Sequence, residues 1–311
     1  MSSILVLQHR CSYGDIPAEY FTSSHLQQIR SHVLDELSWH QTFDISDSAL
    51  IRKTLKDFRD DLIDGLESRI TLLQLAKSKE EPSRNVTLAI ESLIPALKDL
   101  DLPKISSESN IIAAYVHPIM QHLFGHNLSH VGHCANIPPE SDETSKRPDH
   151  ATDLYKEYQR ACPFCFGKVK RQQSTETAKI KHFYRLALFA KAELDKHSLN
   201  GVICFQTIGM STTFYYMTRK SNVLVFVELT TFVFPNKKQN AIELWTYLDE
   251  LISLAALHLL LETNSTTNST SLPSRTVSTI SQPMPTNGGL EYSNTTHYRT
   301  NLESDDQFPA V

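Results

Sequence analysis

The chain has 311 residues, of which 40% are apolar and 21% charged, and its formal net charge is −5. This length allows about two domains with a sizeable core, and the composition is that of an ordinary globular protein. The acidic balance excludes a uniformly basic nucleic-acid binder, but it leaves room for a local basic patch.

Neither a membrane span nor an export signal is expected. The sequence lacks a run of about 18 apolar residues, and its first ten residues lack a basic segment ahead of an apolar one. We therefore expect the protein inside the cell, in the cytoplasm or the nucleus. In such a reducing compartment the five cysteines are expected to be thiols or ligands.

Residues 1–104 are predicted to form a helical region. Apolar residues recur every three or four positions, which places one stripe on a helix. The stripe consists of Ile51, Leu55, Phe58, Leu62, Leu66, Ile70 and Leu73. Ser46 and Asp47 are candidate caps ahead of it, and a second helix is expected over 87–100, with Pro95 kinking or ending it. We expect these helices to pack on the next domain or to offer a surface to a protein partner.

Residues 105–262 are predicted to form one α/β domain. Helices are expected over 108–125, 176–197 and 241–262. Strands rich in β-branched and aromatic residues are expected over 128–137, 147–155, 162–171, 202–208, 212–218 and 223–234. This order indicates a mixed central sheet flanked by helices.

The final segment, residues 263–311, is rich in Ser, Thr, Asn and Pro and shows no apolar periodicity. Such a segment buries too little apolar surface to offset its ordering entropy. We therefore expect a disordered tail.

Two short strings carry the chemical prediction. Residues 146–149 (Lys-Arg-Pro-Asp) begin one predicted strand, and residues 166–170 (Phe-Gly-Lys-Val-Lys) end the next. Residues two apart on a strand share a face. Lys168 and Lys170 are therefore expected to point the same way, with Asp149 opposite them on the paired strand.

This arrangement resembles the PD-(D/E)XK nuclease superfamily, and within it a group of uncharacterised fungal proteins. The resemblance covers residues 105–262 and implies a restriction-endonuclease-like fold. The matching positions are Glu108, Tyr115, Pro118, Arg147, Pro148, Asp149, Gly167, Val169 and Lys170. It implies that Asp149 and Glu108 would hold a magnesium ion that generates the attacking hydroxide, and that Lys170 would position the water.

The sequence departs from this pattern at Lys168, which stands where the second catalytic acid is expected. An ammonium group there removes an oxygen ligand and repels a cation by roughly several kcal/mol in a partly buried site. Magnesium would then need a migrated acid, for which Glu176 and Asp153 are the candidates. Otherwise we expect the two lysines to form salt bridges with Asp149 and Glu108.

The region around these strings is basic. Residues 146–196 contain twelve Lys and Arg against six Asp and Glu. Such a surplus is able to bind phosphate backbones, although it is also typical of a solvated helix face. The leading hypothesis is a catalytically inactive, nuclease-like domain that binds nucleic acid or a protein. The alternative is an active, magnesium-dependent nuclease that uses a migrated acid.

A third hypothesis is a zinc-stabilised structural domain. Cys162 and Cys165 form a C-x-x-C string, and potential ligands lie upstream, namely His126, His130, His133 and Cys134. The spacing matches no standard zinc finger, and residues three apart on a regular strand face opposite ways. A buried strand is the simpler interpretation of the two cysteines.

Overall fold

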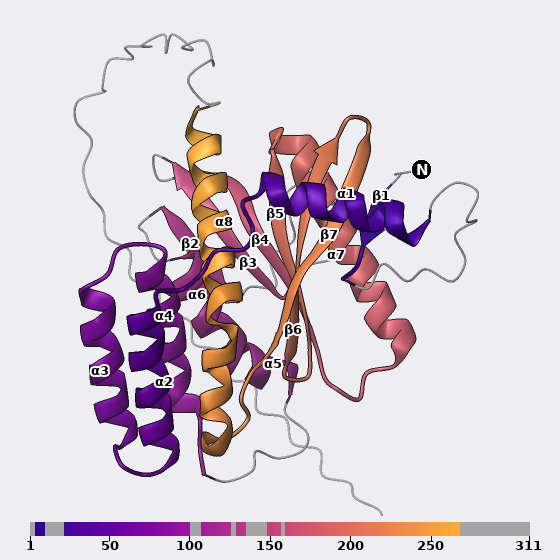
Figure 1. The fold of residues 1–311 in the computed structure, drawn as a ribbon. Helices are drawn as coiled ribbons and strands as arrows, with labels where there is room; N and C mark the ends of the chain where they lie inside the picture. The colour runs from indigo at the N-terminus through magenta and orange to yellow at the C-terminus, as the bar shows by residue number, and fades with distance from the viewer. Residues whose placement is uncertain are drawn as a thin grey trace, which may run out of the picture. The chain divides into compact units, whose positions relative to one another are not determined.

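The structure is a computed structural model that describes residues 4–9, 22–99, 107–125, 129–134, 148–156 and 159–267, with side chains described as far as residue 262. Within these residues the strands form one seven-stranded mixed sheet in the order β1-β7-β6-β5-β4-β3-β2. Helices cover both of its faces (Figure 1). The expected α/β class with a mixed, helix-flanked sheet is confirmed.

The strands are β1 (Ile4–Leu7), β2 (His130–His133), β3 (His150–Lys156), β4 (Gln159–Lys170), β5 (Gly201–Ile208), β6 (Ser211–Lys220) and β7 (Val223–Val233). The helices are α1 (Ser23–Glu36), α2 (Ile45–Arg59), α3 (Gly65–Lys77), α4 (Ser83–Leu93), α5 (Glu108–Ile111), α6 (His117–Phe124), α7 (Glu176–His197) and α8 (Leu248–Thr267). Shorter helical segments are η1 (Ile94–Ala96), η2 (Ile112–Val116) and η3 (Lys238–Tyr247).

Helix α7 covers one face of the sheet. It connects β4 to β5, which pair in parallel, and a parallel pair needs such a crossover. Its buried residues, among them Leu186, Ala190 and Leu194, pack on Phe166 and Phe226 of the sheet. Thr175 caps the helix by accepting from the backbone N–H of Ala178. The helix has the bounds that its periodicity predicts.

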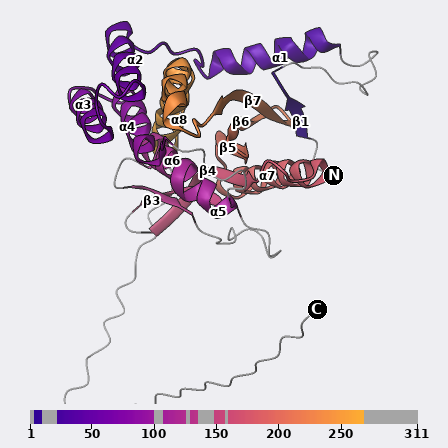
Figure 2. The same ribbon diagram turned by 90° about the horizontal axis from the view of Figure 1, so that it is seen from below.

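The other face of the sheet carries the larger core. One hydrophobic cluster joins residues of α1–α4 with residues of α5, α6, α8 and the strands. Figure 2 shows α8 on the side of the sheet opposite α7. The N-terminal helices therefore form a layer of the same core that the central sheet uses.

The single apolar stripe expected across residues 51–73 is wrong in its second half. The chain turns at 60–64, where Asp61 has a φ of 59°, and α3 begins at a capping box between Asp64 and Glu67. The turn changes the phase of the helix, so that α3 buries Ser68, Leu72, Leu75 and Ala76. The expected core residues Leu62, Leu66, Ile70 and Leu73 are exposed. The expected caps are also displaced, because the N-cap of α2 is Asp44, which accepts from the N–H of Asp47.

The helix predicted over 108–125 is present but interrupted. Ser107 is its N-cap and accepts from the N–H of Asn110. Pro118 has no N–H to donate within the helix, and the turn before it, η2, has π-helical geometry. In the earlier region, Pro95 likewise ends α4, and η1 follows.

The strand predictions after residue 200 are confirmed within a few residues, but β1 was not predicted. Gly209, with a φ of +61°, makes the two-residue turn between β5 and β6. Strand β1 pairs in parallel with β7 at the edge of the sheet. Its sequence, Ile-Leu-Val-Leu, is too short for its periodicity to separate strand from helix.

The last α-helix begins later than the expected residue 241, because residues 238–247 form η3, and it ends later than the expected residue 262. Helix α8 continues to Thr267, so the expected tail begins later than 263, and the remainder of that tail lies outside the described residues. By length and composition alone, the continuous helix Lys238–Glu262 would be able to cross a membrane, which the sequence analysis did not expect. More than half of the 18-residue apolar segment within this helix is buried in the protein, as in a core helix.

Candidate functional site

Asp149 and Lys168 form the centre of the candidate site. Asp149 precedes β3, and its backbone N–H donates to the carbonyl of Gly167 on β4 at 2.9 Å. Lys168 Nζ donates to Asp149 Oδ1 at 3.0 Å, and the backbone N–H of Val169 donates to Asp149 Oδ2 at 2.7 Å. Both carboxylate oxygens therefore have a donor from β4. The Lys168 side chain is 8% exposed, so this is a largely buried ion pair.

Gly167 allows β4 to lie this close to its neighbours. A Cβ atom built on Gly167 would overlap the ring of Phe205 on β5. Phe205 is fully buried and packs against the rings of His150 and Phe214. The glycine therefore lets an aromatic ring fill the space beside the strand that carries the two lysines.

Lys170 pairs with Glu108, which lies 62 residues earlier in the chain. Its Nζ donates to Glu108 Oε1 at 3.0 Å and to Oε2 at 2.8 Å. Glu108 is the first residue of α5, where a carboxylate also interacts favourably with the helix N-terminus. The expected pairing of both lysines with Asp149 and Glu108 is thus confirmed, and the four side chains carry no net charge together.

His182 and Gln206 complete the surroundings of the lysines. Desolvation, followed by the charges of Lys170 and Lys168, lowers the pKa of His182, on α7, to about 4. Its Nδ1 is buried and has no hydrogen-bond partner in the described residues. Gln206 lies beside Lys168 on β5 and donates to the carbonyl of Lys179 at 3.0 Å, which ties the sheet to α7.

Basic and large apolar side chains share the exposed surface of α7 next to this site. Lys181 is exposed and Arg185 is half-buried, one turn apart. Ile180 and Tyr184, also one turn apart, are 65% and 61% exposed. We call these four residues the α7 surface. Cations beside an exposed aromatic ring are typical of surfaces that bind nucleic acid.

The two candidate migrated acids do not join the site. The Glu176 side chain is 81% exposed and pairs with Lys179. Asp153 lies four residues beyond Asp149, about 13 Å along the strand. It is buried in a two-bond pair with Arg160, at 2.8 and 3.0 Å.

The proposed zinc ligands also do not converge in the part of the chain that is described. Cys162 and Cys165 belong to the same core cluster, contrary to the expected opposite faces, because a register shift between Thr152 and Asp153 inserts an extra residue on β4. Burial raises the pKa of the Cys162 thiol to about 11, and it raises that of Cys165 as well. Metal ligation requires thiolates, which this environment disfavours.

The other proposed zinc ligands, which are the upstream histidines and Cys134, do not share one site in the described residues. His130 packs against Phe164 and His258, and His133 lies 3.5 Å from Asp153. Cys134 is exposed, and His126 lies outside the described residues. Among the described residues there is no group of three or more His, Cys, Asp or Glu side chains placed to hold a metal ion.

The sequence analysis missed His182 and Gln206. His182 stands on the predicted helix 176–197, seven residues after its cap, so helix periodicity gives its face but not its neighbours. Gln206 is the residue of β5 in register with Lys168, which only the parallel pairing of β4 and β5 reveals. A polar residue inside an otherwise apolar strand was the available signal.

Comparisons of the chain with models of protein families, with curated proteins and with solved structures gave no match.

Proposed function

We propose that residues 105–262 form a degenerate nuclease-like domain, with a restriction-endonuclease-like fold, that binds nucleic acid without cleaving it. The observation that carries the proposal is the pair of Lys168 and Asp149, 3.0 Å apart. In the resembled family this position would hold a second carboxylate and a metal ion. Here an ammonium group stands in its place.

The arrangement of elements supports the fold part of the proposal. A helix that begins at Glu108 is followed by a hairpin that carries Asp149 and the two lysines. Helix α7 then crosses to β5, which pairs in parallel with β4. This is the order in which the resemblance places its helix, paired strands and following helix around the site.

The donor set argues against magnesium. The Asp149 oxygens accept from Lys168 and from the Val169 N–H, and the Glu108 oxygens accept from Lys170. Magnesium prefers an octahedral set of oxygen ligands, whereas two ammonium groups lie where the cation would bind. The proposed function therefore includes no hydrolytic step.

The α7 surface supports the binding part of the proposal. Lys181 and Arg185 provide positive charge for phosphates, and Tyr184 provides an exposed ring on which a base is able to stack. Because the paired lysines of the site are neutralised, these residues carry the local positive charge. Binding through this surface would depend on the salt concentration and would tolerate changes in the nucleic-acid sequence.

A binding titration tests this function. Labelled single-stranded and duplex DNA and RNA are titrated with the full chain at several salt concentrations. The double variant Lys181→Ala, Arg185→Ala is expected to bind about tenfold more weakly. The slope of the logarithm of its binding constant against the logarithm of the salt concentration is expected to be smaller, by the equivalent of up to about two phosphate contacts. The matched control is Lys53→Ala, Lys77→Ala, which removes two exposed lysines from α2 and α3. The control is expected to bind like the wild type.

Three outcomes would overturn the proposal. If the wild type binds no nucleic acid even at low salt, or if both double variants lose affinity equally, the α7 surface is not the binding site. If the wild type nicks plasmid DNA in the presence of magnesium, and Asp149→Ala abolishes the nicking, the domain is an active nuclease.

A further inference from the structure

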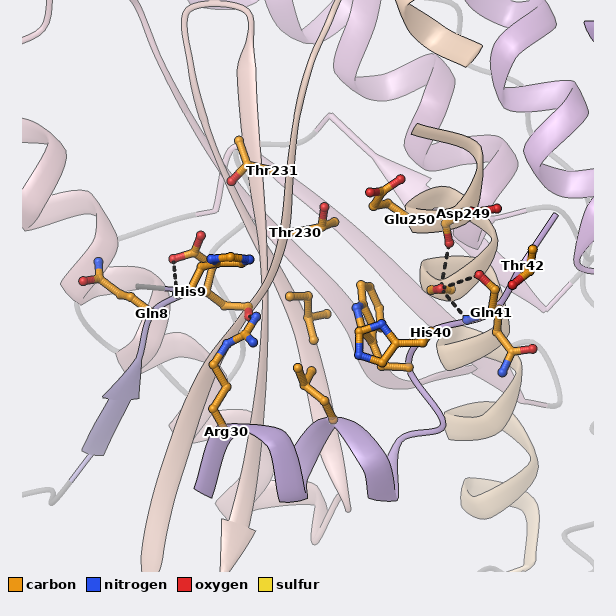
Figure 3. A pocket seen from close by; sticks show the side chains of 15 residues that line it. Gln8, His9, Arg30, His40, Gln41, Thr42, Thr230, Thr231, Asp249 and Glu250 are labelled. Atoms are coloured by element: carbon orange, nitrogen blue, oxygen red, sulfur yellow. Dashed lines mark hydrogen bonds between the residues drawn. The ribbon is translucent and has the colours of Figure 1, made fainter. Parts of the chain in front are cut away.

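A cavity of about 720 Å³ lies between α1, residues 39–42, the end of β7 and α8 (Figure 3). None of the candidate site residues lines it. Its volume falls within the range of roughly 300–1,000 Å³ that is typical of small-molecule pockets. The nucleic-acid proposal assigns it no role.

The cavity arises at the edge of the sheet where β1 stops. Strand β1 pairs with β7 only as far as Val227, and the next residues of β7 include a register shift against β6 that leaves Leu229 without a direct partner. Such a bulge bends the strand. Arg30 of α1 donates to the carbonyl of Glu228 at 2.9 Å, which joins helix and strand across this edge.

Hydrogen bonds hold the opposite wall in place. The backbone N–H of Gln41 donates to Ser253 Oγ at 3.0 Å, and that of Phe43 donates to Asp249 Oδ1 at 2.8 Å. The segment between α1 and α2 is therefore tied to α8. A cavity with walls anchored in this way exists before a ligand binds, which lowers the entropic cost of binding.

Two opposite charges of the lining have unused hydrogen-bonding atoms. Arg30 Nε and Glu250 Oε2 are buried, and neither has a hydrogen-bond partner in the described residues. Leaving such an atom without a hydrogen bond is unfavourable, and more so for a charged group. Figure 3 shows Arg30 reaching in from α1 and Glu250 from α8, on different sides of the cavity.

The two remaining carboxylates of the lining each accept one hydrogen bond from a backbone N–H. Asp249 accepts from the Phe43 N–H, and Glu228 accepts from the His9 N–H at 3.3 Å. Trp39 also lines the cavity and provides apolar surface. Besides these two carboxylates, the lining offers the opposed charges of Arg30 and Glu250 and an apolar wall.

We propose that this cavity binds an amphoteric small molecule of the amino-acid type. Its ammonium group would donate to Glu250, its carboxylate would accept from Arg30, and its carbon chain would lie against Trp39. A ligand with only one of the two charges would leave the other half-buried side chain without a counter-charge. The site therefore discriminates in favour of ligands that carry both charges.

The test uses the full chain and three probe series of matched chain length: ω-amino acids, alkylamines and alkyl carboxylates. Binding is measured by calorimetry and by the rise in melting temperature at millimolar ligand. For at least one chain length, the wild type is expected to bind the ω-amino acid at least about tenfold more tightly than either singly charged probe.

Variants of Arg30 and Glu250 test which end of the ligand each side chain binds. Glu250→Gln is expected to abolish the preference over alkyl carboxylates, and Arg30→Gln the preference over alkylamines. Arg30→Lys, which keeps the charge, should retain part of that preference and shows whether the loss reflects recognition rather than unfolding. Glu243→Gln, an exposed position on η3, is the matched control and should bind like the wild type.

The proposal is overturned if no chain length of the ω-amino acids binds, or if they bind no better than the singly charged probes. It is also overturned if Glu243→Gln weakens binding as much as Glu250→Gln does. These results do not depend on nucleic-acid binding, so the two proposals fail separately.

Discussion

Lys168 Nζ lies 3.0 Å from Asp149 Oδ1, and the neighbouring Val169 N–H holds the other oxygen of the same carboxylate at 2.7 Å. The acid is thereby fixed by the strand on which a second acid was expected. Replacing either side chain leaves the other partly buried without its counter-charge. The contribution of the pair to stability is therefore measurable.

The first prediction concerns the energy of this pair. Lys168→Met is expected to lower the free energy of unfolding by about 1–3 kcal/mol, because Asp149 keeps the Val169 N–H but loses its ammonium partner. Asp149→Asn should cost a similar amount. Urea denaturation of both variants and of the double variant gives the coupling energy, expected at about 0.5–3 kcal/mol. A coupling energy of zero would show that the two side chains do not interact in solution.

The second prediction concerns magnesium. Lys168→Glu places a carboxylate opposite Asp149, so the variant should be less stable than the wild type in a chelator and should regain stability with millimolar magnesium. Thermal unfolding with and without the ion measures this. Lys181→Glu, which adds the same charge on the surface of α7, should show no such rescue. An equal response of the two variants would mean that residues 149 and 168 do not share a site.

The third prediction concerns the close approach of β4 and β5. Gly167→Ala is expected to destabilise the protein by about 1–3 kcal/mol, because the added methyl group overlaps the Phe205 ring. Phe205→Leu should cost stability by itself, yet it should remove part of the cost of Gly167→Ala. Strictly additive losses in chemical denaturation would contradict this contact.

The fourth prediction concerns pH. Burial, followed by the charges of His117 and His133, lowers the pKa of His150 to about 3. The unfolded chain takes up this proton near pH 6.5, whereas the folded protein does so only near pH 3. Stability is therefore unaffected by this group above about pH 6.5 and falls as the pH drops from there towards about 3.

Denaturation between these limits tests the effect. One pKa unit corresponds to about 1.4 kcal/mol, so even part of the shift gives a measurable slope. His150→Gln should lose stability less steeply towards acid than the wild type does. His32→Gln, an exposed position on α1, should follow the wild type. Parallel profiles for the wild type and His150→Gln would be inconsistent with a buried neutral imidazole.

The fifth prediction concerns the phase of α3. Leu72 is 1% exposed and Leu66 is 63% exposed. Leu72→Ala is expected to cost about 2–5 kcal/mol, whereas Leu66→Ser should change stability by less than about 0.5–1 kcal/mol. Comparing the two in one denaturation series checks the phase. A larger loss at Leu66 would restore the single apolar stripe expected from the sequence.

The sequence by itself determined the features that follow local periodicity. The bounds of α7 follow from a capping Thr175 and a 3.6-residue apolar repeat. The two-residue alternation of strands places Lys168 and Lys170 on one face, and Gly209 marks a turn that requires a positive φ. These features depend on the nearest few residues, so one sequence is enough to predict them.

Only the tertiary structure decided which of these elements meet. The turn at 60–64 shifts the phase of α3 and exposes half of the expected stripe, because burial depends on what packs against a helix and not on its pattern alone. The pairing of Glu108 with Lys170, and that of β1 with β7, joins residues far apart in the chain. The cavity between Arg30 and Glu250 likewise combines α1 and α8. Such contacts depend on how the layers pack together, and no local repeat encodes that.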